Sequence, residues 1–143
     1  MNLLLIDLDD TLIDTGDLKK RMIEQLAVLC QTSESAITAV YNSIRNPQSV
    51  VNWFNKFSEE VAKQNGADLE RIKQVIVDAI PQTQVHQHVL HFVKDFNGHK
   101  VIFSFGDPEY QKKKITLLGL NHFFDQILIT EISKLAFLES YEK

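Results

Sequence analysis

Hydrophobic residues recur along this chain with two different periods, and the changes of period divide it into segments. A short unbroken apolar run over residues 3–8 is typical of a strand buried on both faces of a parallel sheet. Over residues 17–97 the apolar positions recur every three or four residues, which predicts a succession of amphipathic helices. After Gly98 the pattern predicts strands over 100–105 and 126–130, with a helix between them.

The helical stretch contains several apolar stripes whose ends are marked by capping residues. The stripes consist of Leu18, Met22, Leu26 and Leu29; Ile37, Val40, Tyr41 and Ile44; Val50, Phe54, Phe57 and Val61; Leu69, Ile72, Val75, Ile76 and Ala79; and Val85, Val89, Phe92, Val93 and Phe96. Asn46-Pro47 predicts the start of the third helix and Asn65-Gly66 its end. Asp68 predicts the start of the fourth helix, and Pro81 its end. The stretch 135–141 predicts the beginning of a last helix.

This order of elements predicts an α/β fold interrupted by a helical insert. A strand, a helix and another strand in succession favour parallel strands joined by right-handed crossovers. We therefore expect a β/α core formed by residues 1–14 and 82–143, and a separate helical segment over residues 15–81.

Composition narrows the class of protein only modestly. The chain has 143 residues, which suit one domain or a small core with an appendage, and its 44% hydrophobic and 24% charged content is ordinary. A net charge of −4 without a basic face argues against nucleic-acid binding, and no apolar run reaches membrane-spanning length. The lone Cys30, expected to be buried, and the absence of a signal peptide favour a cytoplasmic location.

The chemistry of the chain is concentrated where the first strand ends. Asp7 and Asp9 follow the apolar run, and residues i and i+2 of an extended chain point the same way, at the end of a parallel sheet where ligands bind. One carboxylate can attack an electrophile while the other handles a proton, and together they can seat Mg²⁺. Their mutual repulsion calls for a nearby positive charge. The alternatives are a solvated turn or a calcium-binding loop. A calcium loop is disfavoured, because Leu12 and Leu18 occupy the positions at which such a loop needs Gly and Glu.

The stretch Asp7-Leu8-Asp9-Asp10-Thr11-Leu12 resembles the first motif, D-x-D-x-T, of the haloacid dehalogenase-like hydrolases, most of which are phosphatases. The resemblance implies a Rossmann-like core with a helical cap over residues 15–81. It also implies that Asp7 is the nucleophile that forms an aspartyl-phosphate, and that Asp9 protonates the leaving group and then activates water. Mg²⁺ would be held by the Asp7 carboxylate and the main-chain carbonyl of Asp9, with Thr11 on the substrate side.

Two further motifs of the family fall on the second half of the chain. In "VIFSFGD", Ser104 matches the second motif, which binds the phosphoryl group, and Phe105 occupies a position that is commonly small and polar. In "ITEISKLAFL", Lys134 matches the lysine that pairs with the nucleophile. The acidic fourth motif does not occur before Lys143, and Asp107 follows the wrong strand to replace it, so we expect a core that is incomplete on its C-terminal side.

The resemblance implies a Mg²⁺-dependent phosphatase that acts on a small phosphorylated metabolite. Two alternatives stay open: a truncated, non-catalytic relative that binds partners, and a haloacid dehalogenase, which has no use for an acid at Asp9. Without a strand beside it, the first strand would expose an edge through which the chain self-associates. Two other polar clusters are expected on solvated faces: His86, His88 and His91, and Lys112–Lys114, for which substrate steering is an alternative. Trp53 and Phe54 are expected in the core rather than in a substrate pocket.

Overall fold

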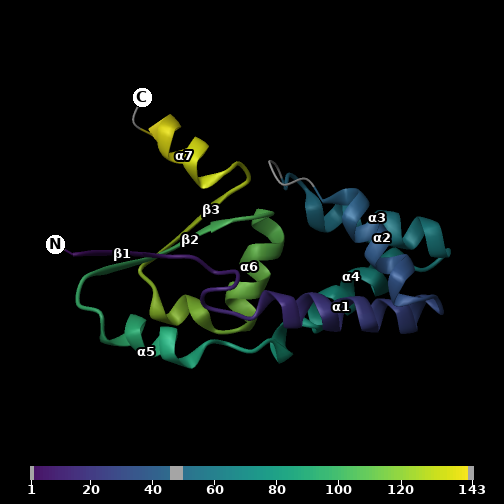
Figure 1. Cartoon of the computed structure of the whole chain (residues 1–143), viewed down its shortest axis with the longest axis horizontal. Helices are drawn as coiled ribbons and strands as arrows, with labels where there is room; N and C mark the ends of the chain where they lie inside the picture. Colours follow the sequence, from purple (N-terminus) through teal and green to yellow (C-terminus); the bar gives the residue numbers. More distant parts are fainter. Residues whose placement is uncertain (1, 46–49, 142–143) are drawn as a thin grey trace.

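A three-stranded parallel sheet and a group of helices beside it make up the structure, a computed structural model that describes residues 2–45 and 50–141 (Figure 1). The strands and helices run in the order β1 (Leu3–Ile6), α1 (Thr15–Cys30), α2 (Glu34–Ile44), α3 (Trp53–Asn65), α4 (Leu69–Asp78), a 3-10 turn (Ile80–Gln82), α5 (Gln87–Asp95), β2 (His99–Phe105), α6 (Pro108–Leu117), a second 3-10 turn (Leu120–Phe123), β3 (Gln126–Thr130) and α7 (Lys134–Tyr141). The α/β architecture expected from the sequence is confirmed.

The sheet has the order β1-β2-β3, and both pairings are parallel. Leu5 lies opposite Val101 in the first pairing, and Phe103 lies opposite Leu128 in the second. The central strand is the most buried, because Val101, Ile102 and Phe103 are at most 7% exposed. The carboxyl ends of all strands therefore meet at one edge of the sheet, which is where the candidate functional residues follow.

The first strand is less buried than its apolar sequence predicts. Leu3 and Leu5 are 58% and 49% exposed, whereas Leu4 and Ile6 pack against a core cluster. The expectation of burial on both faces is therefore wrong for the part of the chain that the structure describes. Alternate side chains of a strand point to opposite faces of the sheet, and only the face of β1 that carries Leu4 and Ile6 packs against a core cluster of the described chain.

The helices α1 to α4 pack around their own hydrophobic cluster, to one side of the sheet (Figure 1). Its fully buried members include Leu26, Ile37, Phe57 and Ile76. As expected, Gly66 in a left-handed conformation ends α3, and the Asp68 side chain caps α4 by accepting a hydrogen bond from the Glu70 amide. Cys30 is only half-buried at the edge of this cluster.

The third helix begins later than the sequence predicts. The expected cap at Asn46 and Pro47 lies outside the described residues, but Val50 to Asn52 are not helical and α3 starts at Trp53. Asn52 adopts a left-handed conformation with φ 57°, and the Trp53 amide donates a hydrogen bond to the Val50 carbonyl. Residues 50–52 therefore form a turn where the sequence predicts helix.

A second hydrophobic cluster lies between the sheet and the helices α5 and α6. It contains Leu8, Leu12, Ile13, Leu90, Val93, Ile102, Ile115 and Leu120. In α5 the inward residues are Leu90 and Val93, whereas Phe92, which was expected to face inward, is 57% exposed. Helix α6 starts directly after β2, with Asp107 as its cap and Pro108 in its first turn, so its face is fixed relative to the end of that strand.

The chain enters and leaves the helical segment through two extended stretches that pair with each other. The Asp14 amide donates to the Gln84 carbonyl at 2.9 Å, and the His86 amide donates to the Leu12 carbonyl at 2.8 Å. Ile13 and Val85 form an antiparallel bridge between these bonds. This pairing lies at the base of the helical segment, although the exact division of the chain into two domains stays a prediction. Among the described helices, none has both the length and the apolar character needed to cross a membrane.

Candidate active site

The loop that follows β1 is a compact turn organised by one main-chain oxygen. The carbonyl of Leu8 accepts hydrogen bonds from the amides of Thr11, Leu12 and Ile13 at 3.4, 3.0 and 3.2 Å. Leu8 itself is fully buried, which anchors the loop in the core beneath the strand ends. The aspartates on either side of Leu8 are held by different partners, so the loop separates their environments.

Asp7 pairs with a lysine from the start of the last helix. Its Oδ1 atom lies 3.0 Å from Nζ of Lys134 and also accepts the Leu8 amide at 2.8 Å. The two side chains are 42% and 32% exposed, so this ion pair remains accessible to solvent. Asp7 and Lys134, which the motifs assign to one site, are thus in direct contact.

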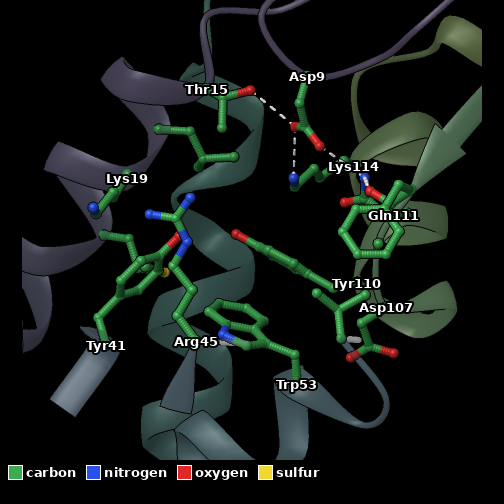
Figure 2. A pocket seen from close by; sticks show the side chains of 15 residues that line it. Asp9, Thr15, Lys19, Tyr41, Arg45, Trp53, Asp107, Tyr110, Gln111 and Lys114 are labelled. Atoms are coloured by element: carbon green, nitrogen blue, oxygen red, sulfur yellow. Dashed lines mark hydrogen bonds and ion pairs between the residues drawn. The ribbon is translucent and has the colours of Figure 1, made fainter. Parts of the chain in front are cut away.

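Asp9 is the most densely bonded carboxylate of the site. Its Oδ1 accepts from the Thr15 hydroxyl at 2.8 Å and from the Lys114 ammonium at 2.9 Å, and its Oδ2 accepts from the Gln111 amide at 2.8 Å (Figure 2). Burial raises the pKa of the Asp9 carboxyl, but the Lys114 charge and the hydrogen bonds outweigh that effect and hold the pKa below its ordinary value. Asp9 is therefore ionised at neutral pH in this arrangement.

Gln111 joins two of the predicted site residues. Its amide nitrogen donates to Oγ of Ser104 at 2.8 Å as well as to Asp9, and the Gln111 side chain is only 3% exposed. The Gln111 side chain also lies against Gly106, where an added Cβ would come within 2.5 Å of it. Ser104 is fully buried beneath this amide, so its hydroxyl contacts Gln111 rather than open space.

A cavity of about 260 Å³ opens between the end of β2, helix α6 and the helical segment. Asp9 and Phe105 line it, together with Thr15, Gly106, Asp107, Gln111 and Lys114 on the sheet side and Leu18, Lys19, Met22, Tyr41, Arg45, Val50, Trp53 and Tyr110 on the other sides. The lining does not include Asp7, Thr11, Ser104 or Lys134. The structure therefore brings Asp9 and Phe105 to this cavity and leaves the other predicted residues outside its walls.

Aromatic rings form the wall of the cavity that faces the helical segment. The Trp53 and Tyr110 ring centroids lie 5.2 Å apart, and Phe54, which is 2% exposed, stacks on Tyr110 from the core side. The expectation that both aromatic neighbours belong to the core is correct for Phe54. Trp53 packs against the same core cluster and also lines the cavity. The Asp107 carboxylate holds this wall in place. This residue caps α6 and accepts a hydrogen bond from the main-chain amide of Phe54, in α3, at 2.7 Å.

The sequence interpretation missed Gln111 and Lys114. Lys114 is 6% exposed, so the interpretation of Lys112–Lys114 as a solvated face is wrong for this member. The spacing of Gln111 and Lys114 could have indicated a shared role, because residues three apart on a helix lie on one face. A helix that starts at Pro108, immediately after the Ser104 strand, turns that face toward the strand ends. By contrast, no histidine cluster of the described chain forms a group of three metal-binding side chains.

The oxygen atoms around Asp7 and Asp9 match the chemistry of a hard divalent cation only in part. Within the described residues, Oδ2 of Asp7 and the Asp9 carbonyl accept no hydrogen bond, so one carboxylate oxygen and one carbonyl oxygen are available. Both are ligand types that Mg²⁺ prefers. No group of three acidic, histidine or cysteine side chains surrounds them in the described chain, so most ligands would be water or substrate.

The fold and the site together define an α/β protein with a carboxylate site at the ends of parallel strands and a helical segment over that site. The chain belongs to the haloacid dehalogenase-like hydrolase family, whose model matches residues 1–139. No curated protein matches the chain in sequence at a significant level.

Solved structures share the fold at low sequence identity. L-2-haloacid dehalogenase from Xanthobacter autotrophicus superposes with a TM-score of 0.64 at 15% identity, over 98% of this chain and 64% of that one. YfnB from Bacillus subtilis, solved with magnesium bound, gives 0.59 at 17% identity, over 91% and 64%. A Thermotoga maritima protein assigned as a β-phosphoglucomutase gives 0.60 at 14% identity, over 94% and 63%. The chain thus spans slightly less than two thirds of the length of these three proteins.

Proposed function

We propose that this site hydrolyses a phosphate monoester of a small metabolite through an aspartyl-phosphate on Asp7. The observation that carries the proposal is the pairing of two neighbouring aspartates with two different lysines, Lys134 at Asp7 and Lys114 at Asp9. Because each carboxylate is paired with a different lysine, the two carboxylates have different electrostatic environments and can take different roles in one reaction.

In the first step, an oxygen of Asp7 attacks phosphorus and the bond from phosphorus to the ester oxygen breaks. The leaving alkoxide takes a proton from Asp9, and the phosphoryl group remains on Asp7. Lys134, 3.0 Å from the Asp7 carboxylate, stays close enough to offset the negative charge that the phosphoryl oxygens bring. Since Asp9 is ionised while it pairs with Lys114, its role as an acid requires it to separate from that lysine and bind a proton first.

In the second step, water attacks the phosphorus of the aspartyl-phosphate. Asp9 accepts a proton from that water, the bond from phosphorus to the Asp7 oxygen breaks, and inorganic phosphate leaves. The hydrogen bonds from Thr15 and Gln111 orient the Asp9 carboxylate for this transfer.

The Asp7 carboxylate and the Asp9 carbonyl would hold Mg²⁺, as the two available oxygens described above. When bound, this ion would neutralise phosphoryl charge and orient the phosphoryl oxygens. The magnesium bound in YfnB, a protein with the same fold, supports the choice of this ion in the proposal.

Dehalogenation is the competing reaction, because the solved relatives include haloacid dehalogenases. Displacement of a halide needs a carboxylate nucleophile but no proton for the leaving group. A second aspartate with three hydrogen-bond partners is therefore better explained by phosphate-ester hydrolysis, in which the leaving oxygen needs a proton.

The test compares the two reactions on one protein preparation. We expect release of phosphate from p-nitrophenyl phosphate in the presence of Mg²⁺, and no release of chloride from 2-chloropropionate. Asp7→Asn should abolish turnover, because the amide is a poor nucleophile, while the fold stays intact as monitored by circular dichroism. Full activity of Asp7→Asn, or chloride release by the wild type, would overturn the proposal.

A second function, self-association through the first strand, is supported by one specific observation. Within the described chain β1 pairs on one side only, and Leu3 and Leu5 are largely exposed. An unpaired strand edge with apolar side chains is a template for another strand. A second copy of the same strand would satisfy its free main-chain groups.

A further inference from the structure

We infer that the substrate carries a second anionic group besides the reacting phosphoryl group, and that Lys19 and Arg45 bind it. This inference rests on the proposed function, because it takes the phosphoryl end of the substrate to lie near Asp9. Both cations line the cavity from the helical segment, Lys19 on α1 and Arg45 directly after α2.

The charges around the cavity do not balance. Its lining contains two carboxylates, and both are already engaged: Asp9 pairs with Lys114, and Asp107 accepts the amides of Phe54 and Glu109 at 2.7 and 3.3 Å. Lys19 and Arg45, in contrast, form no ion pair with any carboxylate of the described chain. Two positive charges therefore face the cavity without a protein counterion.

The two cations converge on one tyrosine. Nζ of Lys19 lies 4.3 Å from the centre of the Tyr41 ring. Burial raises the pKa of the Tyr41 phenol. The positive charge of Arg45 opposes this effect, and the negative charge of Asp9 adds to it. Figure 2 shows the Arg45 guanidinium pointing into the cavity between the rings of Tyr41 and Tyr110. A guanidinium, an ammonium and a phenol hydroxyl together supply the donors that a carboxylate or phosphate accepts.

Apolar side chains make up part of the cavity lining. Leu18, Met22, Val50 and the ring of Trp53 line it together with the charged residues named above. A volume of about 260 Å³ suits a compact metabolite rather than a nucleotide or a peptide. The ligand class is therefore a small phosphomonoester whose short apolar or planar body separates the phosphate from a second anion.

Non-hydrolysable phosphonates test recognition without turnover. The probes are 4-carboxybenzylphosphonate, its carboxamide, and the bisphosphonate with the same benzyl body, together with 3-phosphonopropionate and its carboxamide as a shorter pair. Binding to the wild-type chain is measured by calorimetry. At least one probe that carries a second anion should bind about tenfold or more tightly than the matching carboxamide, because a hydrogen bond to a charged group contributes roughly that factor in affinity. The carboxylate and bisphosphonate arms distinguish the two sources of the second charge.

Variants test whether the preference for the second anion depends on Lys19 and Arg45. Lys19→Met and Arg45→Met should each reduce the preference for the second anion to about threefold or less, because each removes one charged donor. Lys20→Met is the matched control: it removes a neighbouring cation whose side chain is 77% exposed and pairs with Glu24, and the preference should survive. Equal binding of every probe and its carboxamide would overturn the inference, as would a preference that persists in the Lys19→Met/Arg45→Met double variant.

The outcomes separate this inference from the proposed function. Preferential binding without turnover of any phosphate ester would support the second-anion site and overturn the phosphatase proposal. Turnover without preferential binding would support the phosphatase proposal and overturn the second-anion site.

Discussion

Replacing Lys114 by methionine is the most direct test of the network around Asp9. The substitution keeps the length and apolar stem of the side chain but removes the charge that lies 2.9 Å from Oδ1 of Asp9. The Asp9 carboxylate would then remain in a largely buried position with hydrogen bonds only from Thr15 and Gln111. An uncompensated charge of this kind destabilises the folded state.

The size of the effect follows from the exposure of the two partners. Breaking a fully buried ion pair by removing one partner costs about 3–5 kcal/mol. The Lys114 side chain is 8% exposed, but the Asp9 side chain is 28% exposed and keeps two neutral donors. We therefore expect a loss of about 2 kcal/mol in the free energy of unfolding, which lowers the urea midpoint by about 1 M for a chain of this size.

The dependence on pH provides a second signature. The folded-state pKa of Asp9 lies below its ordinary value of 3.8, so its ion pair stabilises the fold above pH 3.8 and the contribution disappears as pH falls through the folded pKa. The difference between wild type and Lys114→Met should thus be largest at neutral pH and shrink below about pH 4.

Two further variants make the test decisive. Lys112→Met, an exposed neighbour on the same helix, should change the urea midpoint little. Asp9→Asn combined with Lys114→Met should recover most of the lost stability, because the buried charge is gone. The reasoning fails if Lys114→Met behaves like Lys112→Met, or if the double variant is no more stable than Lys114→Met alone.

Three other predictions follow from the same structure. Gln111→Leu should lower the free energy of unfolding by about 1–3 kcal/mol in thermal denaturation, because it leaves Ser104 and one Asp9 oxygen without a buried donor; unchanged stability would contradict the role of this amide. Mg²⁺ should bind this chain weakly in calorimetry, since Asp7 and the Asp9 carbonyl supply few of its six ligands, and micromolar affinity would refute that view. Light scattering should detect dimers or larger species that Leu5→Lys on β1 dissociates, whereas a stable wild-type monomer would exclude edge pairing.

Local patterns were sufficient to predict most elements of this fold. The strand over Gln126–Thr130 and the capping of α4 by Asp68 agree with the structure because both depend on residues adjacent in sequence. The start of α3 was wrong because a turn around Asn52, which depends on a left-handed backbone conformation, has no apolar pattern of its own. The exposure of Leu3 and Leu5 was misjudged because burial of a strand side chain depends on what packs over its face of the sheet, which a single apolar run does not reveal.

The ion pair between Asp7 and Lys134 could be expected from the sequence, because both residues follow the carboxyl ends of parallel strands. The catalytic roles of Asp7, Asp9 and Lys134 stay a prediction. Gln111 and Lys114 were overlooked because a lysine-rich stretch resembles a solvated helix face, and only the packing of α6 against the strand ends buries two of its polar residues. The cavity was not predictable at all, since it depends on how the helical segment lies over the sheet.

The paired stretches at Leu12–Asp14 and Gln84–His86 bring the two ends of the helical segment side by side. A segment whose ends meet in this way can be lengthened, exchanged or lost during evolution while the strands keep their register, because the break it would leave is short. Lys19 and Arg45, the residues that we propose to bind a second anion, lie inside that segment, whereas Asp7 and Asp9 lie outside it. Under the proposed function, selection for a new substrate can therefore act on the helical segment and leave the two carboxylates unchanged.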